Sequence, residues 1–403
     1  MNLRQGNKTG LSGNYQATIV ACFLGYIVQA ICNNFVPLLF VFMENSYGIS
    51  LGKITFLTTF NFGLQLVIDA VSAGFIDRIG YRASMILAHA LSAAGLILLA
   101  VLPNVMDPFT GVFICVLIYA VGGGLLEVLV SPIVEACPTD NKETAMSLLH
   151  SFYCWGHVGV VLITTLFFHF IGIRHWQVLS VLWAIVPLAN LFLFAKVPIN
   201  TLIEEGETGL KLAELAKFRL FWVLMLMMVC AGASEQAVSQ WASAYAEEGL
   251  HVSKTIGDLA GPMFFAVMMG SSRAIFGKFG ERMNLERFMT FSAVLCFASY
   301  LVIVFVPSPV IGLIGCGIAG FSVGIFWPGT FSMASAGIKG GGTLMFAMFA
   351  LGGDIGCSLG PTVVGTVASM TGDNLKMGIL AAIVFPVLMF TGIRWRRQAL
   401  SRN

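Results

Sequence analysis

Residues 73–82 read Ala-Gly-Phe-Ile-Asp-Arg-Ile-Gly-Tyr-Arg, and residues 277–284 read Gly-Lys-Phe-Gly-Glu-Arg-Met-Asn. Both stretches follow the pattern small-x-Phe-x-acid-Arg, and each lies between two long apolar runs. Phe75 and Phe279 are 204 positions apart. A duplicated turn of this kind in a very hydrophobic chain predicts two homologous membrane halves, related by an axis along the membrane normal, as in many transporters.

The repeat extends beyond the turn into the neighbouring apolar runs. Pro132 corresponds to Pro328 and Gly156 corresponds to Gly352, in both cases at an offset of 196 residues. This offset is eight residues shorter than 204, as a shorter outer connection in the second half would produce. A constant offset over several helices indicates an internal duplication, because chance similarity between apolar segments would not keep one spacing.

Composition places the chain in a membrane. Of its 403 residues, 57% are hydrophobic and only 10% are charged, against about 25% charged in soluble domains. A helix needs roughly 20 apolar residues to cross a bilayer. Twelve such runs are expected at residues 16–43, 50–76, 83–104, 109–136, 143–170, 176–196, 218–246, 255–276, 287–306, 309–335, 342–370 and 375–393.

These runs predict an all-α membrane protein with twelve transmembrane helices in two pseudo-symmetric six-helix bundles. The expected bundles are residues 1–196 and 218–403, joined by a cytoplasmic linker at 197–217 that is rich in glutamate. Little sequence remains outside the apolar runs, so we expect no soluble catalytic domain.

The distribution of Lys and Arg predicts the topology. If the N-terminus is cytoplasmic, 17 of the 22 basic residues lie in inner loops and tails. The outer loops then hold only Lys53, Arg174, Lys254 and Lys376. By the positive-inside rule, both termini are expected in the cytoplasm. We expect a multi-pass protein of the cytoplasmic (inner) membrane that is monomeric, is surrounded by lipid and has no nucleic-acid partner.

Enzymatic motifs are missing from the sequence. It contains no Walker A loop, no His-Glu-x-x-His and no Cys-x-x-Cys, so ATP-driven transport and the metalloprotease or dithiol redox chemistries have no support. We therefore expect no enzyme activity, no metal site and no cofactor, other than a proton or sodium as a coupling ion.

Polar residues at membrane depth are the candidates for substrate binding, because an ionisable group costs at least ~2.5 kcal/mol at the centre of a membrane helix. Glu127 must be protonated, paired or in contact with water, so it can move a proton or bind hydroxyl groups. Amides and indoles suit a sugar ring, since amides bond its hydroxyls and an indole packs on its C–H face. The predicted substrate-binding residues are Asn33, Asn34, Glu127, Glu235, Gln236, Gln240, Trp241 and Trp327. Structural hydrogen bonding between helices is the alternative for each of them.

Further charged residues are assigned to coupling and gating. His150 can join Glu127 in a proton path, because histidine titrates near neutral pH. Asp69 lies eight residues before Asp77 and is interpreted as a gate or a contact between the halves. The predicted gating residues are Asp77, Arg78, Glu281, Arg282, Arg273 and Asp354. Arg273 requires a counter-ion, either Asp354 or another carboxylate.

The acid-Arg turn resembles that of the major facilitator superfamily, whose inner loop reads Gly-x-Leu-x-Asp-Arg-x-Gly-Arg-Lys. Asp77, Arg78, Gly80 and Arg82 match this pattern, while Ala73, Phe75 and Tyr81 depart from it. Within the superfamily the chain resembles the fucose:proton symporter family over its whole length. The stretches that carry this resemblance are Gly123 to Pro132 with Glu127, Leu149-His150, and Glu235 to Trp241.

The resemblance implies roles for two positions. In the fucose:proton symporter family the helix-four glutamate, here Glu127, is a proton and sugar site. Its partner there is a helix-one aspartate before a proline, and this chain has Asn34 at that place, ahead of Pro37. The replacement leaves open a single-carboxylate symporter, a sodium-coupled carrier or a simple facilitator.

The sequence thus predicts a secondary transporter that moves a small polar solute by alternating access. A monosaccharide (a hexose or deoxyhexose) carried by proton-coupled symport is the first hypothesis. The alternatives are a sodium-coupled or uncoupled sugar carrier, a multidrug, amphiphile or sugar efflux transporter, and a sugar sensor that does not transport.

Overall fold

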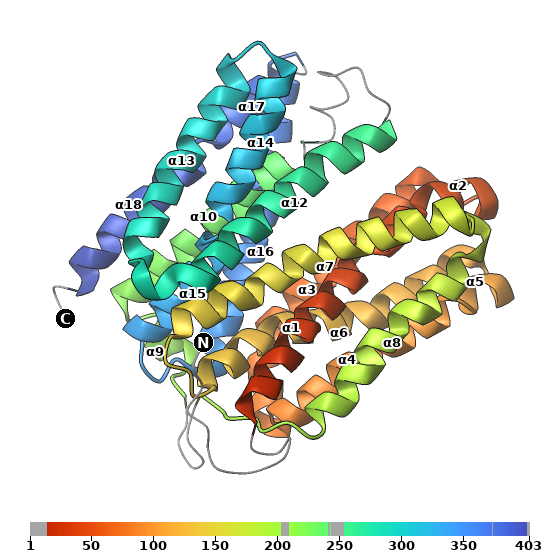
Figure 1. Ribbon diagram of the computed structural model, residues 1–403, viewed down its shortest axis with the longest axis horizontal. Coiled ribbons are helices and arrows are strands. Elements are labelled where there is room, and N and C mark those ends of the chain that lie inside the picture. Colours follow the sequence, from red (N-terminus) through yellow and green to blue (C-terminus); the bar gives the residue numbers. More distant parts are fainter. Residues whose placement is uncertain (1–13, 203–208, 241, 243–253, 373, 401–403) are drawn as a thin grey trace. The chain divides into compact units, whose positions relative to one another are not determined.

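The computed structural model describes residues 14–202, 209–240, 242, 254–372 and 374–400. Every regular element in these ranges is a helix (Figure 1). Together with the apolar spans below, this confirms the predicted all-α membrane fold class.

Two compact units make up the chain. The first contains Met1–Asp140 and Trp155–Glu207, and the second contains Asn141–Cys154 and Thr208–Asn403. The division falls inside helix α7 (Lys142–Phe170), whose first residues belong to the second unit. The bundle limits expected from the sequence, 1–196 and 218–403, stay a prediction.

The described residues of the first unit form seven α-helices in addition to its part of α7. They are α1 (Tyr15–Asn34), α2 (Phe40–Tyr47), α3 (Leu51–Ile79), α4 (Tyr81–Leu99), α5 (Leu102–Val105), α6 (Pro108–Ala136) and α8 (Trp176–Phe194), with 3-10 turns η2 (Val36–Leu39) and η3 (Ile173–His175). Helix α6 packs against α1, α3 and α4, and α4 also packs against α8.

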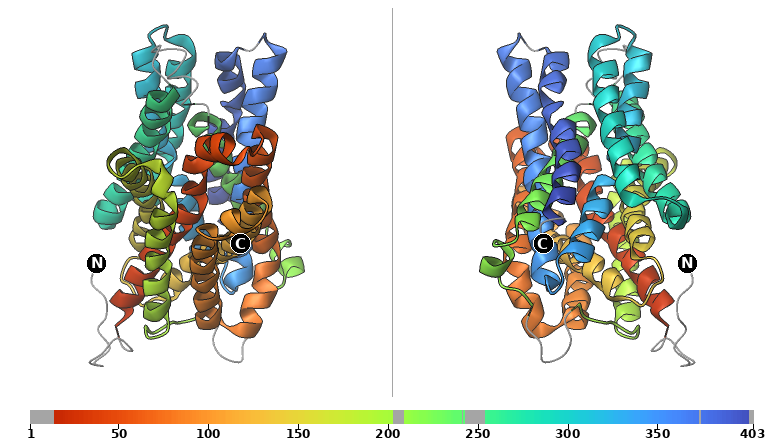
Figure 2. Two further views of the ribbon diagram at one scale, coloured as in Figure 1. Left: turned by 90° about the vertical axis from the view of Figure 1, so that its right-hand side faces the viewer. Right: turned by 90° about the vertical axis from the view of Figure 1, so that its left-hand side faces the viewer.

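The described part of the second unit is also helical, and several of its helices are interrupted. Its described elements are α9 (Leu212–Leu215), α10 (Arg219–Ser239), α12 (Lys254–Phe279), η4 (Gly280–Arg282), α13 (Leu285–Phe305), α14 (Pro309–Val323), α15 (Phe326–Gly337), α16 (Gly342–Met370), α17 (Leu375–Ala382) and α18 (Val384–Leu400). Helices α13 and α14 form one hairpin and α16 and α17 form another, drawn in teal and blue in Figure 2.

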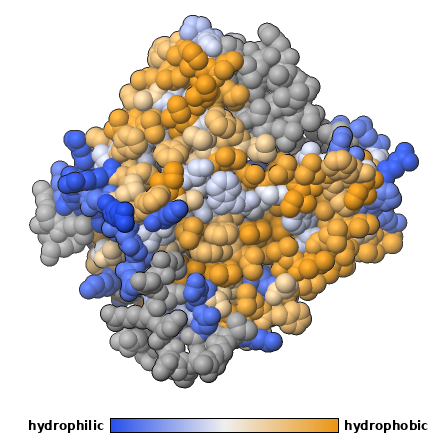
Figure 3. All heavy atoms as spheres, in the orientation of Figure 1, coloured by the Kyte–Doolittle hydropathy of each residue, from blue (hydrophilic) through white to orange (hydrophobic). Residues whose placement is uncertain are grey.

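Ten stretches in the described ranges are long and apolar enough to cross a membrane. The other two expected spans coincide with α3 and α12, which have 29 and 26 residues and are therefore long enough for a hydrocarbon layer of about 30 Å. In α3 the described apolar stretch is shorter, Phe60–Ser72. Twelve spans therefore stay a prediction. Figure 3 shows hydrophobic residues over most of the face drawn, with hydrophilic residues gathered in patches.

Side-chain caps begin several of these helices. Asp107 precedes α6, and its carboxylate accepts hydrogen bonds from the backbone N–H and the hydroxyl of Thr110, while Pro108 fills the first helical position. Asn284 caps α13 in the same way by accepting from the backbone N–H of Arg287. Such caps satisfy N–H groups that have no partner in the first helical turn.

Glycines allow α10 and α16 to approach until their backbones touch. A Cβ atom at Gly356 would overlap the carbonyl oxygen of Val229, and one at Gly360 would overlap that of Ala233. Gly232 on α10 meets the carbonyl oxygen of Gly353 on α16 in the same manner. Small residues at such crossings are typical of tightly packed membrane helices.

Pro328 causes the break between α14 and α15. Pro328 has no backbone N–H, so it cannot donate to the carbonyl of Gly324 four residues earlier. The helix stops at Val323 and starts again at Phe326. The carbonyl of Gly324 is thereby left for another donor.

Candidate functional site

Helix α3 carries three polar residues on one face. Asn61, Gln65 and Asp69 follow one another at intervals of four residues, so they lie along the same side of the helix. All three are buried, and Asp69 is completely excluded from solvent at 0% exposure. A buried polar face on a membrane helix needs partners on its neighbours.

Helix α1 supplies the partners of two of these side chains. Gln65 Nε2 donates to Asn33 Oδ1 at 2.7 Å, and Asn61 Nδ2 donates to the same oxygen at 3.3 Å. Asn33 therefore joins α1 to α3 by accepting two amide hydrogen bonds. One turn earlier on α1, Gln29 Nε2 donates to Glu127 Oε2 of α6 at 2.8 Å.

Glycines on α6 bring α3 and α6 close together near Glu127. A Cβ at Gly124 would lie 3.0 Å from Ile68 Cβ on α3, and one at Gly123 would lie 3.8 Å from Gln65 Nε2. With the helices this close, carboxylate oxygens of Asp69 and Glu127 lie within 4.8 Å of each other. We call Gln29, Asn33, Asn61, Gln65, Asp69 and Glu127 the amide–carboxylate cluster.

The cluster includes some of the residues predicted from the sequence and not others. Asn33 and Glu127 are members, whereas Asn34 turns its Nδ2 to the carbonyl of Ala30 in its own helix at 2.8 Å. Asp69 was interpreted as a gate, and the structure places it beside Glu127. The sequence analysis missed Gln29, Asn61 and Gln65, although the spacing of the last two with Asp69 was visible as a polar face.

A buried arginine organises the second unit. Arg273 on α12 is 3% exposed, and its Nη2 lies 3.5 Å from Oε2 of Glu235 on α10. The sequence left the counter-ion open, and the structure pairs Arg273 with Glu235. Charge pairing of this kind is the usual condition for an arginine at membrane depth.

The other nitrogens of Arg273 bind acceptors on two further helices. Its Nε donates to the carbonyl oxygen of Gly324 at 2.7 Å, which is the carbonyl released by Pro328. Its Nη1 donates to the carbonyl oxygen of His150 at 3.1 Å and contacts Cys154 Sγ at 3.0 Å. One side chain thus joins α7, α10, α12 and the α14–α15 break within the second unit.

His150 lies in that same unit, beside aromatic side chains. Its ring centroid is 5.7 Å from that of Phe331, which in turn stacks on Phe346 at 5.2 Å. Ser147, one turn earlier on α7, donates to the carbonyl oxygen of Arg273 at 2.8 Å. A proton-path role for His150 stays a prediction.

Trp327 packs on a glycine and keeps a free donor. A Cβ at Gly353 of α16 would overlap the indole ring, so the ring lies flat only because position 353 has no side chain. Trp327 is 8% exposed, and its Nε1 has no acceptor among the described residues. It can therefore offer both an apolar face and a hydrogen-bond donor.

The remaining predicted residues differ in burial. Gln236 on α10 is half-buried, and Gln240 at the end of that helix is exposed. Asp354 on α16 is half-buried. Trp241 lies outside the described residues, and so does the side chain of Asp77.

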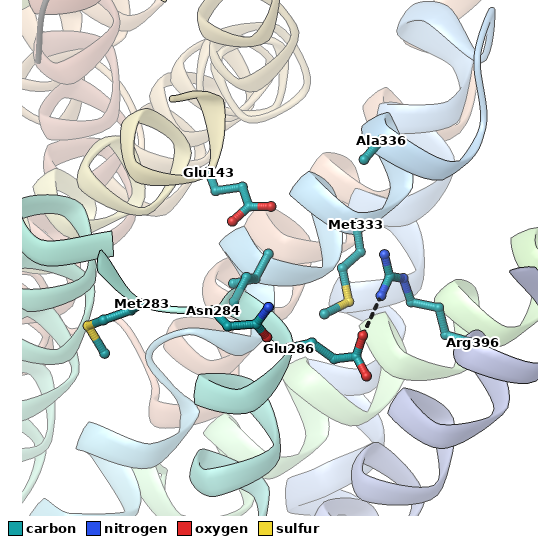
Figure 4. Close-up of a pocket in the computed structure, with 8 residues that line it drawn as sticks. Glu143, Met283, Asn284, Glu286, Met333, Ala336 and Arg396 are labelled. Carbon is teal, nitrogen blue, oxygen red and sulfur yellow. Dashed lines mark hydrogen bonds and ion pairs between the residues drawn. The ribbon is translucent and has the colours of Figure 1, made fainter. Parts of the chain in front are cut away.

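The predicted gating turn of the second unit lies next to a cavity of about 210 Å³. Glu281 and Arg282 are exposed in η4, just before α13. In the cavity, Arg396 Nη1 of α18 bonds Glu286 Oε2 of α13 at 3.1 Å, and Glu143 of α7 points into the same space (Figure 4). Arg397 also pairs with Glu286. In the first unit Arg78 is exposed.

A family model of known proteins now identifies the chain. Residues 22–361 match the Major Facilitator Superfamily. The chain belongs to the major facilitator superfamily. As a member, it is a multi-pass membrane transporter for a small molecule and not an enzyme.

Solved structures of other major facilitator proteins share its fold. A single-residue variant of the fucose:proton symporter FucP of E. coli matches with a TM-score of 0.80 at 19% identity, covering 95% of this chain and 99% of that one. The proton:xylose symporter XylE, bound to 6-bromo-6-deoxy-D-glucose, matches with 0.80 at 12% identity and 95% coverage of both chains. The human organic anion transporter MFSD10 matches with 0.72 at 15% identity, covering 94% and 99%. No curated protein sequence matches.

Proposed function

We propose that this major facilitator protein carries a monosaccharide, a hexose or deoxyhexose, across the cytoplasmic membrane by proton-coupled symport. The observation that carries the proposal is the hydrogen bond from Gln29 to Glu127 inside a cluster of amides and carboxylates. Amide groups with both donors and acceptors suit the hydroxyls of a sugar, and a carboxyl group can take up and release a proton.

The structural neighbours point in the same direction. Two of them are named as proton symporters of fucose and xylose. In the second unit, Trp327 provides the flat apolar surface and the free donor that bind the C–H face and an oxygen of a sugar ring. We further propose a monomer with both termini in the cytoplasm, on the distribution of Lys and Arg.

Transport by purified protein in proteoliposomes tests the proposal. Radiolabelled D-glucose, D-galactose and L-fucose are each offered under an inward proton gradient, under an inward sodium gradient and with no gradient. We expect one of these sugars to accumulate only with the proton gradient. Glu127→Gln should abolish accumulation but keep exchange of labelled for unlabelled sugar, because exchange needs no net proton movement.

Glu135→Gln serves as the matched control, since Glu135 is a buried acid on the same helix. Full accumulation by Glu127→Gln would remove the coupling role of Glu127. Accumulation driven by sodium would instead support the sodium-coupled carrier. Transport of lipophilic cations that sugars do not inhibit would support the multidrug exporter, and sugar binding without flux would support a sensor.

A further inference from the structure

The inference concerns Asp69, a buried acid that the proposed function does not use. Asp69 has 0% exposure on a membrane helix. An acid in that environment is costly to maintain, so a functional role is the first hypothesis for it. Its neighbours on the same face, Asn61 and Gln65, both bond Asn33, which fixes this face of α3 against α1.

Asp69 lies close enough to Glu127 to interact with it strongly. Their carboxylate oxygens come within 4.8 Å in an interior formed by α1, α3 and α6. Two negative charges at this separation repel each other, and the repulsion is strengthened where water is excluded. One proton held by the pair removes that repulsion, as in other carboxyl dyads.

A second observation shows that the cluster lacks hydrogen-bond donors. Gln29 is 3% exposed and gives its Nε2 to Glu127, yet its Oε1 has no donor within the described part of the chain. Asn61 Oδ1 is buried and also has no donor there. Buried acceptors without partners are costly. An O–H group on a protonated carboxyl is a donor that the cluster itself can supply to Gln29.

We propose that Asp69 and Glu127 form a carboxyl pair that holds one proton between them, and that this pair carries the coupling proton. The proposal rests on the proposed symport. Position 34 on α1 is an asparagine, which donates to the carbonyl of Ala30 in its own helix. Asp69 on α3 then takes the place of the helix-one acid that the chain lacks. Coupling requires only that one O–H bond forms when a proton enters and breaks when that proton leaves.

Other titratable groups on the neighbouring helices have contacts of their own. Tyr26 of α1 bonds Ser131 Oγ, and Cys32 of α1 lies beside Gly123. His89 of α4 bonds the carbonyl of Met85 and the amide of Asn190. Tyr119 of α6 is buried against Gly95 of α4.

Infrared difference spectroscopy of the protein in lipid vesicles tests the pair without any sugar. The pH is varied and the C=O stretch of protonated carboxyl groups is followed in the wild type and in variants. We expect one titrating band in the wild type. In Asp69→Asn and in Glu127→Gln it should titrate at lower pH, because the remaining carboxyl group no longer faces a second negative charge, and the double variant should lose it. Glu135→Gln should leave the band at its wild-type pH, and Asp69→Glu, which keeps both carboxyl groups, should return the titration towards that of the wild type.

Three results would overturn the pair. One is a band that titrates at the wild-type pH in Asp69→Asn, and another is a pair of bands that respond independently to the two substitutions. The third is loss of the band on adding sodium at constant pH, which would make the cluster a sodium site. A melting temperature close to that of the wild type shows that a variant is folded. If Asp69→Asn does not fold, the Asp69→Glu variant still tests the pair.

The transport assay separates this inference from the proposed function. Asp69→Asn should lose proton-driven accumulation of the transported sugar while it keeps sugar exchange. Wild-type protein that shows the shared band but exchanges none of the three sugars would contradict the sugar proposal and leave the pair standing. Wild-type accumulation that Asp69→Asn retains in full would contradict the pair and leave the sugar proposal standing.

Discussion

Arg273 Nε donates a 2.7 Å hydrogen bond to the carbonyl oxygen of Gly324. Because Pro328 cannot donate to that carbonyl, the guanidinium takes the place of a missing backbone N–H. The same side chain is paired with Glu235 at 3.5 Å. Arg273 thus both supplies the donor that the helix break lacks and pairs its own buried charge with a counter-ion.

Arg273→Gln is expected to destabilise the protein strongly. Removal of the guanidinium leaves the Glu235 carboxylate buried without its counter-ion, and breaking a buried pair costs about 3–5 kcal/mol. The apparent melting temperature in detergent, followed by tryptophan fluorescence, measures the effect. The double variant Arg273→Gln, Glu235→Gln should melt above the single variant, since no carboxylate is then left alone. A double variant that melts below the single one would rule out this explanation.

Gly353→Ala should displace the Trp327 ring. The added Cβ would overlap the indole, so the ring or the α16 backbone must move, at a cost of about 1–3 kcal/mol. Gly159→Ala on α7 is the matched control, because a Cβ there meets nothing within 4 Å. Melting temperature and tryptophan emission wavelength are the measurements. Equal effects of the two substitutions would show that helix propensity, not the ring, decides the result.

Gln29→Leu should weaken proton-driven sugar uptake more than Asn34→Ala does. Gln29 donates directly to Glu127. A hydrogen bond to a charged group contributes about 1.5–3 kcal/mol, so we expect the concentration of sugar that gives half-maximal uptake to rise roughly tenfold or more in Gln29→Leu. Asn34 instead donates to the carbonyl oxygen of Ala30 in its own helix. Concentration dependence of uptake in proteoliposomes gives the comparison. Comparable losses in the two variants would contradict the assignment of Gln29 rather than Asn34 to the site.

The cap of α6 should make stability depend on acid pH. The backbone N–H and hydroxyl of Thr110 bond the Asp107 carboxylate and lower its pKa below the usual range. A carboxyl with a lowered pKa in the folded state stabilises the protein above its unfolded pKa, near pH ~4, and loses this contribution as the pH falls. Asp107→Asn keeps a cap but should lose its share of the decrease in melting temperature on acidification. An unchanged pH profile in that variant would assign the decrease to other groups.

The fold could be predicted because bilayer thickness imposes a length on apolar runs, and ten stretches in the described ranges meet it. Helix α3, with 29 residues, is long enough as well. Asn61, Gln65 and Asp69 lie on this helix, and they belong to the cluster described above.

The site could be predicted only in part, because its pairings join helices far apart in the sequence. Glu127 and Asn33 were found as polar groups in apolar runs, but the donor to Glu127 is Gln29, 98 residues away. The sequence required a carboxylate for Arg273 without indicating which one. Glu235 is the partner because α10 packs near α12, and no local pattern in the sequence indicates that pairing.

The glycine contacts between α10 and α16 also limit how these helices can change during a transport cycle. With backbone against backbone at Gly232, Gly356 and Gly360, turning either helix about its own axis would push a larger side chain into its neighbour. The two helices are therefore expected to travel as one rigid body. The distance between Gln236 on α10 and Gly353 on α16, against which the Trp327 ring packs, would then stay the same at every stage of the cycle.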